Sequence, residues 1–217
     1  MEKLQDIVNQ YILSEISQVD IGQQRCKDMA TWTPNVQGNF TCASAFHLLR
    51  QKKEPTPMMS KVWIKELPFK ISFNIWRTIY KKLSFADTLQ RLYVALLPTC
   101  VCCRAPKIES LNHVFTISDM ASSVWSYISP ALGFKTRGRN ILSILNHWWS
   151  IPTKNHAPKF LLQITPMIVL WELWKAICGK KYGTKSISTY NICQQVLLQV
   201  KISMRLKFSK MGWDWNW

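Results

Sequence analysis

The chain has 217 residues, of which 47% are hydrophobic, and it carries a formal net charge of +16. That apolar content is enough to bury a core and excludes an intrinsically disordered protein. Seven cysteines, an odd number, without a secretory signal pattern indicate a reducing compartment, so we expect an intracellular protein of the nucleus or cytoplasm that is not secreted. The longest apolar run, residues 160–174, is too short for a membrane span.

The first predicted elements are helices on either side of one small β-hairpin. Apolar residues recur at helical spacing over residues 2–19, which predicts an amphipathic helix. Residues 34–38 form a turn cluster between two short apolar runs, and this pattern predicts a hairpin. Ser44 is the expected N-cap of the next helix. A further helix is expected over residues 60–67, ending before Pro68.

The rest of the chain is predicted to be helical, so the expected fold class is mainly α with one small β-hairpin. Helical spacing of apolar residues predicts a short helix through Leu89 and longer ones over residues 71–83, 121–132, 140–150, 158–178 and 187–207. Pro166 should kink or split the helix over 158–178. The large aromatic side chains of the first half are expected to share one core: Trp32, Phe40, Phe46, Trp63, Phe73 and Trp76.

A cluster of cysteines is the most specific chemical signal. Cys100, Cys102 and Cys103 lie within four residues, and His113 follows. The spacing of Cys100 and Cys103 lets two thiolates converge on one cation, with His113 as a third ligand. Residues 114–118 offer no good fourth ligand, and Cys102 is an awkward substitute because adjacent residues rarely face one ion. Inert buried thiols and a redox pair remain alternatives.

Positive charge is concentrated in the second half of the chain. Residues 121–217 contain 13 Lys and Arg against 2 Asp and Glu, a net charge of +11. Such a field attracts phosphate backbones, although the lysines could simply solvate helix faces. The residues expected to contact RNA or DNA are Lys180, Lys181, Lys185, Lys201, Arg205, Lys207 and Lys210. Two carboxylates in this half cannot build a two-metal nuclease, so we expect no enzymatic activity.

A series of residues and short motifs over residues 28–126 resembles the pattern of a known family. In chain order they include Trp32, Gly38-x-Phe40-Thr41, Leu67-Pro68, Leu83-Ser84-x2-Asp87, Cys100-x2-Cys103, Glu109-x3-His113 and Trp125. The series resembles the zinc-binding region that follows the reverse transcriptase in plant LINE-type retrotransposon polyproteins. Residues 170–176 resemble the tryptophan-rich segment that links that region to a ribonuclease H domain.

The resemblance implies both a site and a domain organisation. Cys100, Cys103 and His113 match the metal-ligand positions of the family, whereas Ser118 stands where the fourth ligand is usually a cysteine. One zinc ion is therefore expected to bind weakly or not at all. The implied domains are an N-terminal helix and linker (1–27), an irregular helical zinc-binding-type domain (28–126) and a basic helical region (127–217) that contains no ribonuclease H domain.

The expected function follows from these features. We expect a non-enzymatic fragment of a retrotransposon polyprotein, with a degenerate zinc-binding domain and nonspecific nucleic-acid binding. A protein-interaction module and a relic without selected function are the alternatives. The oligomeric state is not indicated by the sequence.

Overall fold

The structure, a computed structural model, describes residues 10–18, 30–50, 56–93, 99–133, 136, 140–183 and 187–209. The chain divides into two units, Met1–Glu54 and Pro55–Trp217. Helices dominate the described residues, which confirms the mainly α fold class. The β-structure found among these residues is one isolated antiparallel bridge, between Thr99 and Ile108.

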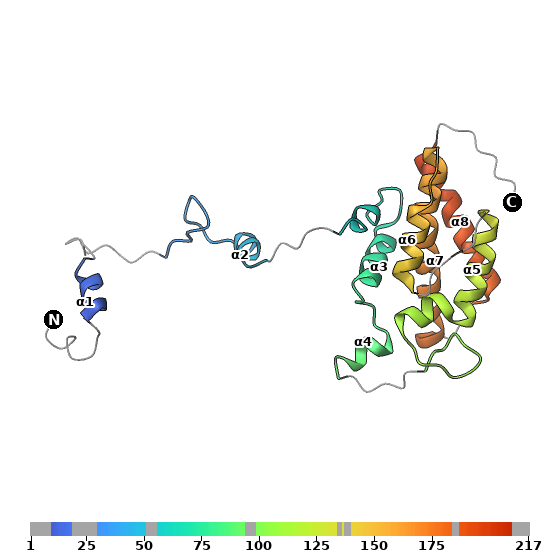
Figure 1. The fold of residues 1–217 in the computed structure, drawn as a ribbon, viewed down its shortest axis with the longest axis horizontal. Helices are drawn as coiled ribbons and strands as arrows, with labels where there is room; N and C mark the ends of the chain where they lie inside the picture. Colours follow the sequence, from blue (N-terminus) through green and yellow to red (C-terminus); the bar gives the residue numbers. More distant parts are fainter. Residues whose placement is uncertain are drawn as a thin grey trace. The chain divides into compact units, whose positions relative to one another are not determined.

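The first unit contains two short helices, α1 (Gln10–Ser17) and α2 (Cys42–Leu49) (Figure 1). The described part of the predicted N-terminal helix is thus helical. The predicted β-hairpin is wrong. The N–H of Trp32 donates to the carbonyl of Gly38 at 2.8 Å and closes a loop, but residues 30–42 form no strand. A ladder requires repeated pairs along both chains, and a single crossing bond does not extend into one.

Two details of this unit explain its local structure. Gly38 has a φ of +72°, and a Cβ there would lie 2.7 Å from Cγ2 of Thr31, so the turn requires glycine. Thr41, not Ser44, is the N-cap of α2: its hydroxyl accepts from the N–H of Ser44 at 3.1 Å. The Ser44 hydroxyl accepts in return from the N–H of Thr41 at 3.2 Å. This reciprocal capping box places Ser44 inside the first turn, so the predicted N-cap lies three residues too late.

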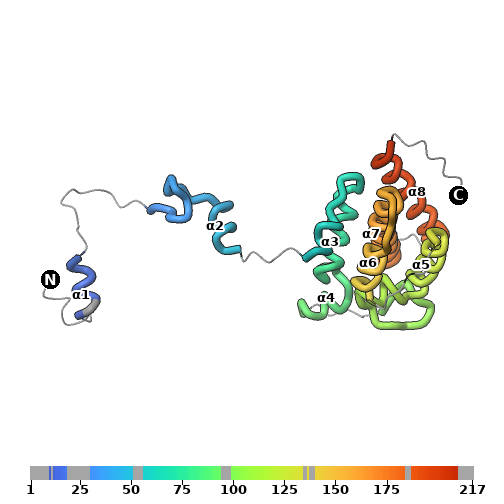
Figure 2. Tube along the Cα trace, turned by 45° about the horizontal axis from the view of Figure 1, so that its top comes forward, coloured from blue at the N-terminus to red at the C-terminus, as the bar shows by residue number. Residues whose placement is uncertain are grey.

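The second unit is a bundle around one buried helix, α7 (His156–Tyr182). Around it pack α3 (Phe69–Ile79), α5 (Asp119–Ala131), α6 (Ile141–Ser150) and α8 (Thr189–Lys207). Figures 1 and 2 show α7 inside this group, with α3 on one side and α5 and α8 on the other. A helix covered on all sides carries apolar residues all round.

This central helix is long and apolar enough to cross a membrane by length and composition. However, 72% of its most apolar stretch is buried inside the bundle, as is typical of a core helix. Pro166 was predicted to kink or split this helix, and the structure contradicts the split, because α7 runs unbroken through Pro166. Proline removes one intrahelical hydrogen bond. Pro166 is buried among the neighbouring helices, and this packing offsets the loss of that bond.

Short irregular helices connect the bundle: η1 (Met59–Lys61), α4 (Ala86–Gln90) and η2 (His113–Ile117), a π-helical turn. The helix predicted over residues 60–67 is wrong, since only the 3-10 turn η1 forms. Val62 and Leu67 are both buried in the core. Side chains five positions apart do not share one face of an α-helix, so an irregular path is needed to bury both.

The predicted shared aromatic core is also wrong. Phe40, Phe46, Trp63 and Phe73 are exposed, and Trp76 is half-buried. The largest fully buried side chains include Trp148, Phe85 and Phe115, and these rings contact other aromatic rings of the second unit. On α3 the aliphatic residues Ile71 and Ile75 are buried in the core, and the aromatic residues lie elsewhere on the same helix.

Replacing Trp148 with alanine should destabilise the bundle strongly. The side chain is completely buried, and such truncations cost roughly 3–5 kcal/mol. Tyr190, 64% exposed on α8, is the matched control and its alanine variant should melt like the parent chain. Thermal unfolding followed by circular dichroism measures both. Equal melting temperatures for the two variants would contradict this core.

Candidate metal centre

The cysteine loop is held in place by backbone contacts before any side chain is considered. It lies between α4 and η2, and the bridge of Thr99 with Ile108 closes its base. The N–H of Cys100 donates to the carbonyl of Lys107 at 2.8 Å. Cys100 is consequently buried and fixed, and His113 begins the π-helical turn that follows the loop.

The structure brings the three predicted ligands together. The sulfurs of Cys100 and Cys103 and a ring nitrogen of His113 all lie within 4.8 Å of one another. The Cys103 Sγ and His113 Nε2 atoms are 3.2 Å apart. Ligand atoms around tetrahedral zinc are separated by about 3.5–3.8 Å, given typical bond lengths to sulfur and nitrogen. Two thiolates and an imidazole therefore fit zinc, with one coordination position left for another ligand.

The electrostatics of Cys100 favour its thiolate, the form that binds metals. A hydrogen bond from the side chain of Cys102 is the largest influence, and the pKa of Cys100 falls to about 5 despite burial. The backbone N–H of Cys102 also donates to the Cys100 sulfur at 3.4 Å. Burial raises the pKa of Cys103, and the nearby thiolate of Cys100 and carboxylate of Asp119 add to this effect.

Cys102 has a different place in the site. Its sulfur is not among the three ligand atoms that converge. The hydrogen bond to Cys100 and burial both raise the pKa of Cys102, so it remains a thiol that donates to the neighbouring sulfur. This arrangement makes Cys102 a support for Cys100 in the metal-free protein.

Ser118, which the resemblance places where a fourth ligand is expected, makes structural hydrogen bonds. It is completely buried, and its hydroxyl donates to the carbonyl of Val114 at 2.9 Å. The same oxygen accepts from the N–H of Ala121 at 3.1 Å, which makes Ser118 the N-cap of α5. Both hydrogen bonds satisfy helix-end groups.

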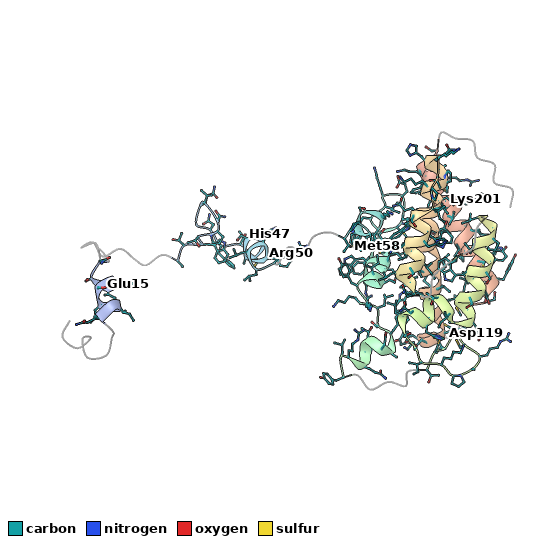
Figure 3. All side chains as sticks on the ribbon, in the orientation of Figure 1. Glu15, His47, Arg50, Met58, Asp119 and Lys201 are labelled. Carbon is teal, nitrogen blue, oxygen red and sulfur yellow. The ribbon has the colours of Figure 1, made fainter. Side chains whose placement is uncertain are left out.

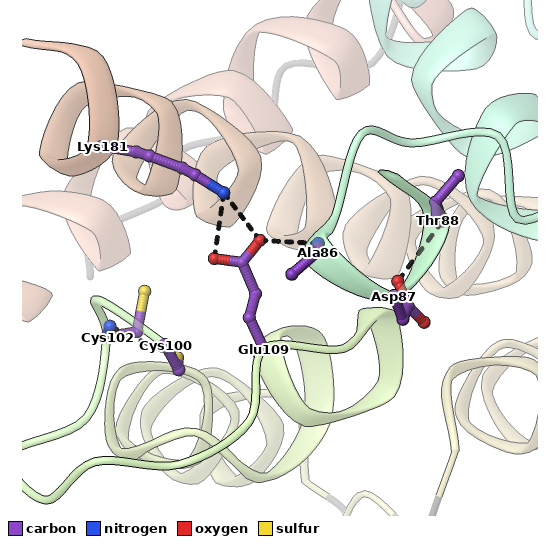
Figure 4. Close-up of polar contacts among 7 residues, drawn as sticks. All are labelled: Ala86, Asp87, Thr88, Cys100, Cys102, Glu109 and Lys181. Carbon is purple, nitrogen blue, oxygen red and sulfur yellow. Dashed lines mark hydrogen bonds and ion pairs between the residues drawn. The ribbon is translucent and has the colours of Figure 1, made fainter. Parts of the chain in front are cut away.

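Glu109 is the residue of this region that sequence reasoning missed. Its buried carboxylate accepts from Lys181 Nζ at 2.9 and 3.2 Å and from the N–H of Ala86 at 3.2 Å (Figure 4). One side chain thus joins the end of the cysteine loop to the start of α4 and the last turn of α7. Glu109 is one of the family landmarks, but nothing in the sequence indicates a partner 72 residues away.

Among the described residues, the lysines and arginine predicted to contact nucleic acid do not gather into one patch. Lys180 and Lys181 lie in the last turn of α7, near Cys102 and Glu109 respectively. Lys207, near the other end of α7, pairs with Glu66 at 2.6 Å and lies over the ring of Phe160. The 21 residues from Phe160 to Lys181 span about 30 Å of helix.

Lys201 and Arg205 are one helical turn apart on α8. Figure 3 labels Lys201 and Asp119 near opposite ends of the bundle, which separates these basic residues from the metal site. Lys185 and Lys210 lie outside the described residues.

Comparisons with known proteins agree with the resemblance seen in the sequence. Residues 40–125 match the family described as zinc-binding in reverse transcriptase, and this segment contains Cys100, Cys103 and His113. An Arabidopsis thaliana protein named "Putative ribonuclease H protein" is 19% identical over an alignment of 164 residues that covers 72% of this chain and 26% of that protein. The chain therefore spans about a quarter of this relative. No solved structure matches the chain.

Lys181 and Lys180 offer a matched pair for testing the buried ion pair. Lys181→Ala should lower the free energy of unfolding by about 3 kcal/mol, because it leaves the Glu109 carboxylate buried without its cation. Lys180→Ala removes the same charge from the same turn and should cost less than about 0.5 kcal/mol. Urea unfolding measures both values. Similar losses for the two variants would show that the ion pair adds nothing to stability.

The metal site can be tested by native mass spectrometry with added zinc. We expect at most one zinc ion per chain, bound less tightly than at a four-ligand site. Cys103→Ser and His113→Ala should each abolish this binding, whereas Cys102→Ser should keep it because its sulfur lies outside the converging group. Loss of zinc from the Cys102 variant would instead identify Cys102 as the fourth ligand.

Proposed function

We propose that this chain is the zinc-binding region, with its downstream linker, of a retrotransposon-derived polyprotein, and that it binds nucleic acid without strong sequence preference. The observation that carries the proposal is the convergence of Cys100, Cys103 and His113 inside the segment that matches the zinc-binding family. A zinc ion there would link the cysteine loop to the π-helical turn and stabilise the fold.

The proposal assigns no catalysis to this region. Three glutamates of the second unit, Glu66, Glu109 and Glu172, each face a lysine in an ion pair. Two of these pairs join different elements, the pair of Glu172 lies within α7, and carboxylates paired with lysines are not arranged around a metal pair. The ribonuclease H named in the relative belongs to a longer protein, of which this chain covers 26%.

Nucleic-acid binding is proposed from charge. A net charge of +16 attracts any polyanion, and bound phosphates release counterions from the nucleic acid. Lys201 and Arg205, on one side of α8, are suitable contacts. We also propose an intracellular location, nuclear or cytoplasmic, which agrees with the free thiols of all six described cysteines.

The salt dependence of binding tests this proposal. With a labelled single strand and the full chain, log affinity should fall linearly with log salt, by about 0.7 per phosphate contact. Lys201→Ala combined with Arg205→Ala should reduce that slope by up to about 1.4. The matched control replaces the exposed neutral residues Gln194 and Gln195 on the same helix with alanine. Fluorescence anisotropy gives the slopes, and absent binding at low salt would refute the proposal.

A further inference from the structure

A row of five aromatic side chains lies along the surface of the second unit. This aromatic stripe consists of Trp63, Phe69, Phe73, Trp76 and Tyr80. Successive ring centroids are 5.7, 5.8, 5.6 and 5.4 Å apart, and the first three pairs are stacked with interplanar angles of 26°, 14° and 13°. The rings therefore form one continuous series.

Four of the five rings, those of Phe69, Phe73, Trp76 and Tyr80, lie on the side of α3 opposite to its buried residues, and Trp76 is half-buried and also packs against the core. Ile71, Ile75 and Thr78 are buried on the opposite side of the helix. Positions 69, 73, 76 and 80 follow the helical repeat, so their side chains share one face. Phe69 is 70% exposed and Phe73 is 41% exposed. A contiguous apolar row of this kind on a protein surface usually marks a binding site.

The geometry of the rings leaves room for further stacking. Parallel rings whose centroids are separated by 5.6–5.8 Å are offset and do not eclipse one another. The exposed fractions of Trp63, Phe69 and Phe73 leave ring surface open to solvent. A flat, unpaired base can stack on such a surface whatever its identity, because every base has a π-face.

The charges around the stripe are almost all positive. Residues 61–82 contain six Lys and Arg against one acidic residue, Glu66, which is already paired with Lys207. Lys70 and Arg77 lie seven residues apart along one edge of α3, and Lys81 and Lys82 are exposed beyond its end. Charged residues are depleted at the core of protein interfaces, whereas aromatic rings with adjacent lysines are typical of single-strand binding grooves.

We propose that the aromatic stripe and its basic edge bind single-stranded nucleic acid, with bases stacked on the rings and phosphates beside Lys70, Lys81 and Lys82. This proposal rests on the proposed function and deepens it by naming the strand state that is recognised. Paired bases inside a duplex hide their faces, so the stripe selects single strands over duplexes. The lysines of α7 and α8 that are predicted to contact nucleic acid then contribute nonspecific electrostatic attraction for the strand.

The test separates stacking from charge by using two oligonucleotides of equal length. One is oligo-dT, and the other is an abasic strand that keeps every phosphate but no base. The full chain should bind oligo-dT at least about fivefold more tightly than the abasic strand, the lower end of the range for one stacked base. Phe69→Ala combined with Phe73→Ala should remove this difference and leave abasic binding unchanged.

Two further variants control for folding and for aromatic content. Phe69→Tyr with Phe73→Tyr keeps both rings and should preserve the preference for oligo-dT. Tyr127→Ala with Tyr190→Ala removes two exposed rings outside the stripe and should also preserve it. Equal, salt-dependent binding of both strands by the unmodified chain would overturn the stacking role but leave the proposed function intact. Binding to neither strand would overturn both and favour a protein partner for the stripe.

Discussion

The buried ion pair of Glu109 with Lys181 attaches the end of the cysteine loop to the last turn of α7. The loop itself contains little regular structure, apart from one bridge and the hydrogen bond of Cys100 with Lys107. Burying a carboxylate is costly unless its lone pairs are satisfied. Glu109 meets this condition with the ammonium group of Lys181 and the N–H of Ala86. One side chain thus connects the cysteine loop, α4 and α7. The position of His113, four residues later, depends on this anchor.

The π-helical turn from His113 to Ile117 sets the geometry on the other side of the site. The N–H of Ser118 donates to the carbonyl of His113 at 2.7 Å, a bond across five residues. Such turns are rare and are often found at functional sites. Ser118 ends this turn and begins α5, so a residue that replaces a ligand in the family pattern has taken over a capping role. A site with three ligands can therefore retain the fold of the surrounding helices.

The parts of the fold that follow from local rules could be predicted from the sequence. The spacing of Cys100, Cys103 and His113 placed them in one site, and apolar periodicity located the helices of the bundle. The predictions that were wrong concern features that tertiary packing decides. Both faces of α3 are apolar, and the sequence does not tell which one the core uses. Likewise, Pro166 was expected to interrupt α7, but packing on every side keeps that helix continuous.

The order of elements along the chain has a consequence for synthesis. The most apolar helix, α7, is completed at Tyr182, whereas α8, which packs along it, ends only at Lys207. At typical translation rates the ribosome needs roughly 1–5 s to add those 25 residues. During that interval one side of α7 lacks its cover, on a helix with the length and composition of a membrane span. The second unit can bury this side of α7 only after α8 has been synthesised, so the order of the elements delays completion of the core.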